Sequence, residues 1–213
     1  QNVKIVGFGG GMGISTLGPT HHATEDIGVL RTLPNLTIFS PASPREVEKV
    51  VMEAYKINGP VYIRLGMTGE KEIYNEDFSF TPEKVVQIKK GEDITFFTTG
   101  SIITEAIAAA DMLAEKGIHA HIYNVHTLKP FDNGTVIHCA KKRRPIFSIE
   151  EHSVTGGLGS IIAEIIAENG LNVPFKRIGL TNCFASGYGT VEEMRKINHI
   201  DSFAIYESVL RAL

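Results

Sequence analysis

The 213-residue sequence contains no tryptophan, only two cysteines, and no apolar stretch near the length of a membrane span. A transmembrane helix needs about 20 consecutive apolar residues, so we expect no membrane partner. Cys139 and Cys183 lie far apart and lack the spacing of a metal site. This pattern is typical of reduced thiols in a cytoplasmic protein, and it argues against a disulfide-stapled secreted domain.

The sequence also lacks an excess of positive charge. It holds 21 lysines and arginines against 24 aspartates and glutamates, for a net charge of −3. Such a balance does not attract a phosphate backbone or an anionic membrane. The only basic run, KKRR at 141–144, precedes Pro145 and fits the C-terminal end of a helix, where the dipole favours cations. We therefore expect no nucleic acid partner.

Short apolar segments alternate with segments of helical periodicity along the chain. Strands are predicted at 3–8, 36–39, 61–65, 85–88, 94–98, 120–125, 146–149 and 175–178. This alternation predicts an α/β fold with parallel sheets. Periodicity is lost at 67–82, which is rich in Gly, Glu, Asn and Asp, so we predict a linker there. The expected domains are then 1–66 and 83–213, the alternative being one domain with a long surface loop.

A turn, two histidines and a predicted helix follow one another at 18–35. Pro19 and the candidate N-cap Thr20 suggest that a helix begins here, with Ile27, Leu30 and Leu33 on its core face. His21 and His22 would then lie at its N-terminus, behind the glycine-rich run 7–13. Small residues let a ligand approach the backbone, and a helix N-terminus favours an anion. We therefore expect a ligand site at this point.

The same stretch resembles the transketolase family. The resemblance rests on Gly-Pro-Thr-His-His at 18–22, Glu-Asp at 25–26, Leu-Arg-Thr-Leu-Pro-Asn at 30–35, and the segments 124–132 and 150–159. It covers nearly all of the chain. It implies a partial parallel-sheet pyrimidine-binding domain at 1–66, followed by a Rossmann-like three-layer α/β C-terminal domain at 83–213. Because the sequence opens within a predicted strand, we expect a fragment or subunit of the complete enzyme.

The resemblance also implies roles for individual residues. His21 matches the family histidine near the thiazolium carbon, where it would bind the donor and move a proton, and His22 would lie beside the substrate. Arg64, at a strand end, would bind a sugar phosphate through its guanidinium fork. Two positions depart from the family pattern: Leu17 replaces an acidic residue, and glycines occupy 9–11. These departures suggest an altered donor sugar.

A second cluster joins Glu150, Glu151 and His152 to the glycines at 156–159. The glycine spacing does not match a dinucleotide fingerprint, so we interpret the turn as seating a helix close to the sheet. In the family this loop faces the domain interface, where it would support the site without being catalytic. The individual roles of the three polar residues stay open at this stage.

The resemblance implies thiamine diphosphate and Mg²⁺ in the complete enzyme. The family's activating glutamate and its diphosphate-binding half lie outside this sequence, so we expect the chain alone to bind neither cofactor and to be inactive. Its partner would be a second copy in a homodimer, or an N-terminal diphosphate-binding subunit. The expected reaction moves a two-carbon ketol unit from a ketose, expected to be a sugar phosphate, to an aldose. The alternatives are a deoxyxylulose-phosphate synthase, a 2-oxoacid dehydrogenase β chain, or a non-catalytic assembly module.

Overall fold

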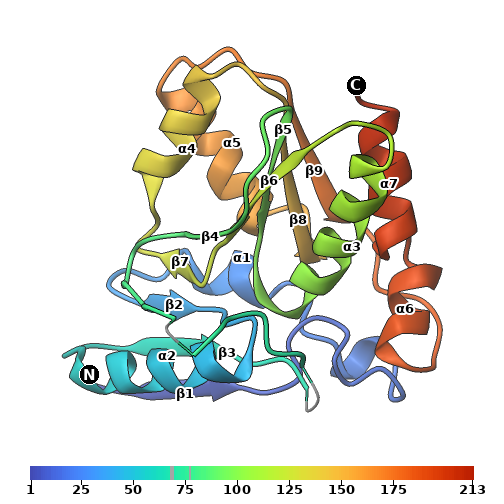
Figure 1. Cartoon of the computed structure of the whole chain (residues 1–213). Helices are drawn as coiled ribbons and strands as arrows, with labels where there is room; N and C mark the ends of the chain where they lie inside the picture. The colour runs from blue at the N-terminus through green and yellow to red at the C-terminus, as the bar shows by residue number, and fades with distance from the viewer. Residues whose placement is uncertain (68–69, 77) are drawn as a thin grey trace.

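The computed structural model describes residues 1–67, 70–76 and 78–213. Two β-sheets lie in one α/β molecule, with helices packed around them (Figure 1). The strand order is β1-β3-β2-β7 in the first sheet and β4-β6-β5-β8-β9 in the second. Most strand pairs are parallel, which confirms the predicted fold class. Residues 68, 69 and 77 of the predicted linker lie outside the described residues.

The first sheet is built from short apolar strands. β1 (Lys4–Gly7) and β2 (Thr37–Phe39) both pair in parallel with β3 (Val61–Arg64), and every residue of β3 is buried. Helix α2 (Pro44–Lys56) packs through Val50 and Ala54 against Phe39, Val61 and Ile63. The carboxyl ends of the three parallel strands therefore meet at one edge of the sheet.

The fourth strand of this sheet comes from the second half of the chain. β7 (Thr127–Lys129) pairs with β2 in the antiparallel sense. No strand was expected here from the sequence, because three residues are too few to establish a period. The predicted boundary between 1–66 and 83–213 stays a prediction, and the sheet pairing shows that backbone hydrogen bonds cross it.

The second sheet forms the middle of three layers. Strands β5 (Ile94–Thr98), β6 (Ala120–Asn124), β8 (Ile146–Ser153) and β9 (Phe175–Leu180) are parallel, and β4 (Val86–Lys89) joins β6 as an antiparallel edge. One face carries α3 (Ile103–Ala114), α6 (Val191–Ile197) and α7 (Ser202–Leu210). The other carries α4 (Asn133–Lys141) and α5 (Leu158–Glu168) (Figure 1). The predicted three-layer arrangement is thereby found.

The order of the parallel strands reverses direction at β5. The chain passes from β5 to β6 on one side and later returns to β8 on the other. In such sheets ligands and functional groups gather beyond the carboxyl ends of the strands at the reversal. Here the residues that follow β5, including the 3₁₀ turn η2 (Gly100–Ile102), and the end of β8 face the carboxyl edge of the first sheet.

Candidate functional site

His21 lies in the 3₁₀ turn η1 (Pro19–His21), and the predicted helix around it is much shorter than expected. Helix α1 runs only over Asp26–Leu30, so the prediction that the two histidines open a helix is wrong. Leu33 is 49% exposed and does not face the core. Thr20 does not cap a helix; its Oγ1 lies 3.0 Å from Nδ1 of His21. The exposed imidazole of His21 is thus oriented by its neighbour.

His22 has a different environment from His21. It is half-buried, and both ring nitrogens lack a hydrogen-bond partner in the part of the chain that the structure describes. Burial lowers the pKa of His22, against the opposing effect of the Glu151 carboxylate. Buried polar groups in native proteins almost always find a partner. The Glu151 carboxylate and the backbone of Ile14 are among the polar groups that act on this ring, and both raise its pKa against the effect of burial.

The glycine run beyond β1 is filled by side chains of this chain. A Cβ on Gly10 would lie 2.9 Å from Cγ of Arg64, and one on Gly11 would lie 2.5 Å from Oε1 of Glu151. Gly11 also has a positive φ of 68°. Gly11 and Ala23 exchange two backbone hydrogen bonds of 2.9 Å, which tie the loop to the residues after His22. The expected ligand approach at these glycines is replaced by internal packing.

Arg64 is at the end of β3, as predicted, but two of its three guanidinium nitrogens, Nε and Nη2, donate to internal partners. The residue is 6% exposed. Its Nε donates to the carboxylate of Asp26 at 2.9 Å, and its Nη2 donates to the carbonyl oxygens of Ala23 (2.9 Å) and Glu151 (3.1 Å). Asp26 also occupies the first turn of α1, where the sequence suggested an external anion. These contacts favour a structural role for Arg64, and its phosphate contact stays a prediction.

Glu150 and His152 at the end of β8 serve the packing of α5 and α1. Glu150 accepts hydrogen bonds from the backbone N–H of Leu158 (2.7 Å) and Gly159 (2.9 Å), at the start of α5. Burial raises the pKa of Glu150 to about 7. A side chain at Gly157 would overlap Glu150, so the glycines seat α5 close to the sheet, as the sequence indicated. Nε2 of His152 accepts a 3.3 Å hydrogen bond from the backbone N–H of Gly28.

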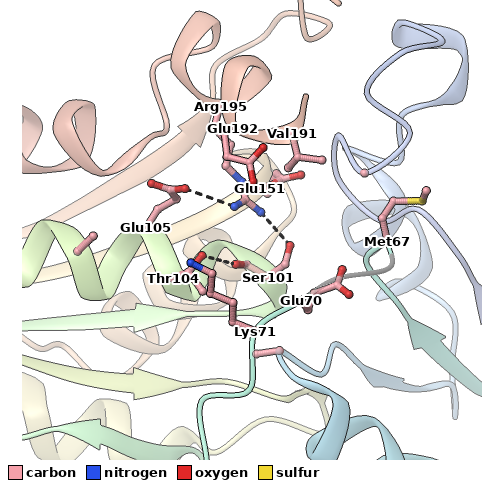
Figure 2. Close-up of a pocket in the computed structure, with 13 residues that line it drawn as sticks. Met67, Glu70, Lys71, Ser101, Thr104, Glu105, Glu151, Val191, Glu192 and Arg195 are labelled. Carbon is pink, nitrogen blue, oxygen red and sulfur yellow. Dashed lines mark hydrogen bonds and ion pairs between the residues drawn. The ribbon is translucent and has the colours of Figure 1, made fainter. Parts of the chain in front are cut away.

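Glu151 joins the two sheets. Its Oε1 accepts a 2.7 Å hydrogen bond from the backbone N–H of Met12, and its Oε2 accepts a 2.6 Å bond from Nε of Arg195 on α6. Arg195 also reaches Ser101 and Glu105 (Figure 2). Sequence reasoning missed Arg195, because its partner lies 44 positions away and no local spacing links them.

A cavity of about 310 Å³ adjoins this pair. Its wall includes charged and hydroxyl side chains drawn in Figure 2, among them Lys71, Ser101, Glu105, Glu151, Glu192 and Arg195. Among the described residues, His21 and His22 are not part of this wall. The two histidines predicted for the site and the cavity are therefore separate features. Glu151 belongs to the wall of the cavity and also binds the backbone of Met12, in the loop that is hydrogen-bonded to Ala23 after the histidines.

Neither a metal cluster nor a membrane span occurs within residues 1–67, 70–76 and 78–213. In these ranges no three His, Cys, Asp or Glu side chains gather as a metal site would require. Over the same ranges, no helix is both apolar enough and long enough to cross a bilayer.

Comparison with known protein families assigns both halves of the chain. Residues 1–68 match the transketolase pyrimidine-binding domain, and residues 83–200 match the transketolase C-terminal domain. The chain belongs to the transketolase family, as the motifs at 18–35 and 150–159 suggested.

Several relatives are named as subunits of divided enzymes. A subunit of the apulose-4-phosphate transketolase of Actinobacillus succinogenes is 38% identical over 209 residues, covering 98% of this chain and 67% of that protein. The 6-deoxy-6-sulfo-D-fructose transketolase subunit SqwH of Clostridium sp. is 38% identical, covering 86% and 56% respectively. The 1-deoxy-D-xylulose-5-phosphate synthase of Halothermothrix orenii is 34% identical, covering 91% and 31%.

A solved structure described as a split gene transketolase, inactive beta4 tetramer, has the same fold. It superposes with a TM-score of 0.89 at 34% identity, covering 99% of this chain and 67% of that one. The transketolase of Campylobacter jejuni shares the fold at 16% identity, with a TM-score of 0.74 and coverage of 98% and 31%. This chain spans about two thirds or less of the length of each of these proteins.

The family depends on thiamine diphosphate, and the described residues fit part of that cofactor's surroundings. His21 is exposed and oriented, and His22 holds two buried nitrogens without a partner among the described residues. Both suit polar groups of a bound cofactor or substrate.

Proposed function

We propose that this chain is the pyrimidine-binding and C-terminal portion of a transketolase that transfers a two-carbon ketol unit from a ketose to an aldose. The observation that carries the proposal is the exposed, oriented His21 in a Gly-Pro-Thr-His motif, on a chain that matches both transketolase domains. A diphosphate-binding segment or subunit completes the site. The relatives named as transketolase subunits and the tetrameric split transketolase support this division.

The chain's own contribution to the reaction is a proton-moving group. Thiamine diphosphate, when bound, supplies the carbanion that carries the two-carbon unit. His21 binds a hydroxyl of the donor and takes or returns its proton, a task for which imidazole is suited near neutral pH. The contact of Nδ1 with Thr20 holds the ring in one orientation. A preset orientation spares the entropy of ordering the base during the reaction.

The donor differs from the usual pentose phosphates. Leu17 is 55% exposed just before the His21 motif, where many transketolases carry an acidic residue. An exposed leucine offers apolar surface to the donor in place of a hydrogen bond to its hydroxyls. Relatives named for apulose 4-phosphate and for a sulfonated fructose support the proposal of an unusual ketose.

The surface of the first sheet supports association with a partner segment. β1 lies at one edge of this sheet, and its residues Ile5 and Val6, together with Phe8 just beyond, are each about half exposed. Apolar side chains along an edge strand are usually covered in the functional assembly. We propose that the diphosphate-binding portion, or another copy of the pyrimidine-binding portion, covers this face.

A deoxyxylulose-phosphate synthase is the second candidate, favoured by relatives such as the Halothermothrix orenii enzyme. The two reactions use different donors: a transketolase takes a ketose, whereas the synthase takes pyruvate. The test is product analysis of the complete enzyme with each donor and a common aldehyde acceptor. We expect a lengthened ketose and a released aldose from the ketose donor, and no turnover of pyruvate. Turnover of pyruvate with release of CO₂ would instead support the synthase.

A non-catalytic assembly module is the remaining alternative. In that case the complete assembly would give the same ketol-transfer rate whether or not His21 is replaced. The exposed position of His21, outside the three hydrophobic cores of the described residues, argues against a purely structural role. The same assay, run on the His21→Ala variant, separates the two.

A further inference from the structure

We propose that Glu151, in the C-terminal domain, is a positioning residue for the catalytic His21 in the pyrimidine-binding domain. It fixes the glycine loop 9–13 against the backbone that follows His21 and His22. This inference rests on the proposed function, because it assumes that His21 acts in ketol transfer.

The loop is anchored in the C-terminal domain through Met12. The Met12 side chain is fully buried and belongs to the hydrophobic core formed by the second sheet and its helices, which also contains Phe96 and Ile102. Its backbone N–H donates to Oε1 of Glu151 at 2.7 Å. Thus one residue of the pyrimidine-binding domain is held by both packing and a charge-assisted hydrogen bond from the other domain.

The anchored loop is in turn tied to the histidines. Gly11, next to Met12, exchanges two 2.9 Å backbone hydrogen bonds with Ala23, which directly follows His22. Arg64 links the two ends of this set of contacts directly, because its Nη2 donates to the carbonyl oxygens of both Ala23 and Glu151. A displacement of the Glu151 side chain is therefore passed to the backbone of the histidine turn through two short, buried links.

Arg195 keeps the Glu151 carboxylate in place. The Nε of Arg195 donates to Oε2 at 2.6 Å, while its Nη2 donates to Oγ of Ser101 at 2.9 Å (Figure 2). Both side chains of the pair are nearly buried, at 7% and 3% exposure. A buried carboxylate needs such a partner to remain charged. The pair thus presents Oε1 to Met12 in one fixed geometry.

The same contacts would also be expected of a buried ion pair that merely joins two domains. The two roles differ in one respect. If the ion pair only joins the domains, replacing Glu151 lowers the stability of the protein, and any effect on kcat is the same with or without His21. A positioning role acts through His21, so its effect on rate disappears once His21 is gone.

The test is a double-mutant cycle on the complete transketolase assembly, with kcat for ketol transfer as the readout. Glu151→Asp keeps the charge for Arg195 but withdraws the carboxylate from Met12. We expect kcat to fall by about 10- to 100-fold, the usual effect of a small misplacement at a reacting centre. In the His21→Ala background the same change should lower kcat by less than about twofold, because the group it positions is absent.

Glu164→Asp is the matched control. Glu164 also forms a cross-domain ion pair, with Arg31, on a part of the surface away from the 9–13 loop. We expect its kcat to match wild type. Should Glu151→Asp not fold, Glu151→Gln serves in the same cycle, because its amide must turn an NH₂ toward one of two donors, the Met12 N–H or the Arg195 Nε.

The outcomes separate this inference from the proposed function. Equal effects of the Glu151 change with and without His21, or wild-type kcat in the Glu151 variant, would overturn the positioning role alone. Wild-type kcat in the His21→Ala single variant would overturn the proposed site itself.

Discussion

His21 and Arg64 show how surroundings decide what a polar side chain does. His21 is exposed and its ring contacts the hydroxyl of its neighbour Thr20, so the rest of the imidazole is available to a substrate. Arg64 lies at a strand end that suits phosphate binding, yet its donors reach Asp26 and two carbonyl oxygens. The same motif-based reasoning selected both residues, and only the contacts distinguish them.

Arg64→Ala should destabilise the protein by about 3–5 kcal/mol, the cost of leaving one partner of a buried ion pair alone. Asp26, only 13% exposed in its side chain, would lose its ion-pair partner and the 2.9 Å hydrogen bond from Nε of Arg64. Urea unfolding of the variant measures this. Arg45→Ala is the control, because its ion pairs with Glu72 and Glu76 are long and partly exposed. If the variant instead kept its stability and showed a raised KM for phosphorylated donors, the result would contradict the structural role and support the predicted phosphate contact of Arg64.

His21→Ala should lower kcat of the complete enzyme by roughly 10²–10⁴-fold, the usual effect of removing one acid–base group. Thiamine diphosphate affinity should change little, because its diphosphate is held elsewhere. Steady-state kinetics and cofactor titration measure the two effects. Thr20→Val, which removes the hydroxyl beside Nδ1, should give a smaller loss of kcat. A His21→Ala variant with normal kcat would contradict the assignment.

The histidine motif could be located from the sequence, but the contacts around it could not. The Gly-Pro-Thr-His pattern is local and therefore visible. The pairs Arg64–Asp26 and Arg195–Glu151 join residues 38 and 44 positions apart, and no period or spacing connects them. The lack of side chains at Gly10 and Gly11 suggests space for a ligand, and this lack can be read from the sequence. That Arg64 and Glu151 occupy the space cannot be read from it, because they lie far away along the chain.

At the scale of elements, helix α2 holds a buried carboxylate that connects three segments. Glu46 accepts hydrogen bonds from the backbone N–H of Ala42, the hydroxyl of Tyr74 and Nδ2 of Asn124. Tyr74 belongs to the predicted linker and Asn124 to β6. On this helix the apolar Val51 is 46% exposed, whereas the charged Glu46 is fully buried. An inward-facing glutamate is not expected from hydrophobic periodicity.

Glu46 should make stability fall as pH rises. Burial raises the pKa of Glu46 from 4.5 to about 7. Between these values the folded protein binds a proton that the unfolded chain does not, so this stabilisation is complete below about pH 4.5 and lost as pH rises through about 7. Glu46→Gln should remove this fall from the dependence of the melting temperature on pH between 5 and 8, leaving the contributions of Glu150 and of buried histidines such as His126. Glu48→Gln, on the exposed face of α2, is the control; an unchanged slope in Glu46→Gln would refute this prediction.

The long elements were predictable and the short ones were not. The strands β5 and β6, the first half of β8 and the start of β9 follow from apolar runs, and the helices between them follow from helical spacing. The loop expected from residue 150 is wrong at its start, because β8 continues to Ser153. Thr190 and Glu193 have the three-residue spacing of a capping box at the start of α6, and both of its hydrogen bonds are present. α1 and β7 have five and three residues, and tertiary contacts rather than local pattern determine them.

At the scale of the whole molecule, the two predicted domains are interlocked. From the second half of the chain, β7 extends the first sheet and Asn124 donates to Glu46 on α2. From the first half, Met12 packs in the core of the second sheet. Cleavage of one bond within 66–82 should therefore leave two pieces that remain associated in native buffer. Size-exclusion chromatography after limited proteolysis measures this, with elution in urea as the control for a completed cut. Pieces that separate without denaturant would show that the crossing contacts are weak.

The central claim is that this chain supplies His21 to a ketol-transfer site that a diphosphate-binding portion completes. The most direct measurement is aldose release from a ketose donor by this chain, by the diphosphate-binding portion, and by the two combined with thiamine diphosphate and Mg²⁺. We predict turnover only in the combination, and its loss when the chain carries His21→Ala. Turnover by the chain alone, or undiminished turnover by the combination with His21→Ala, would contradict the claim.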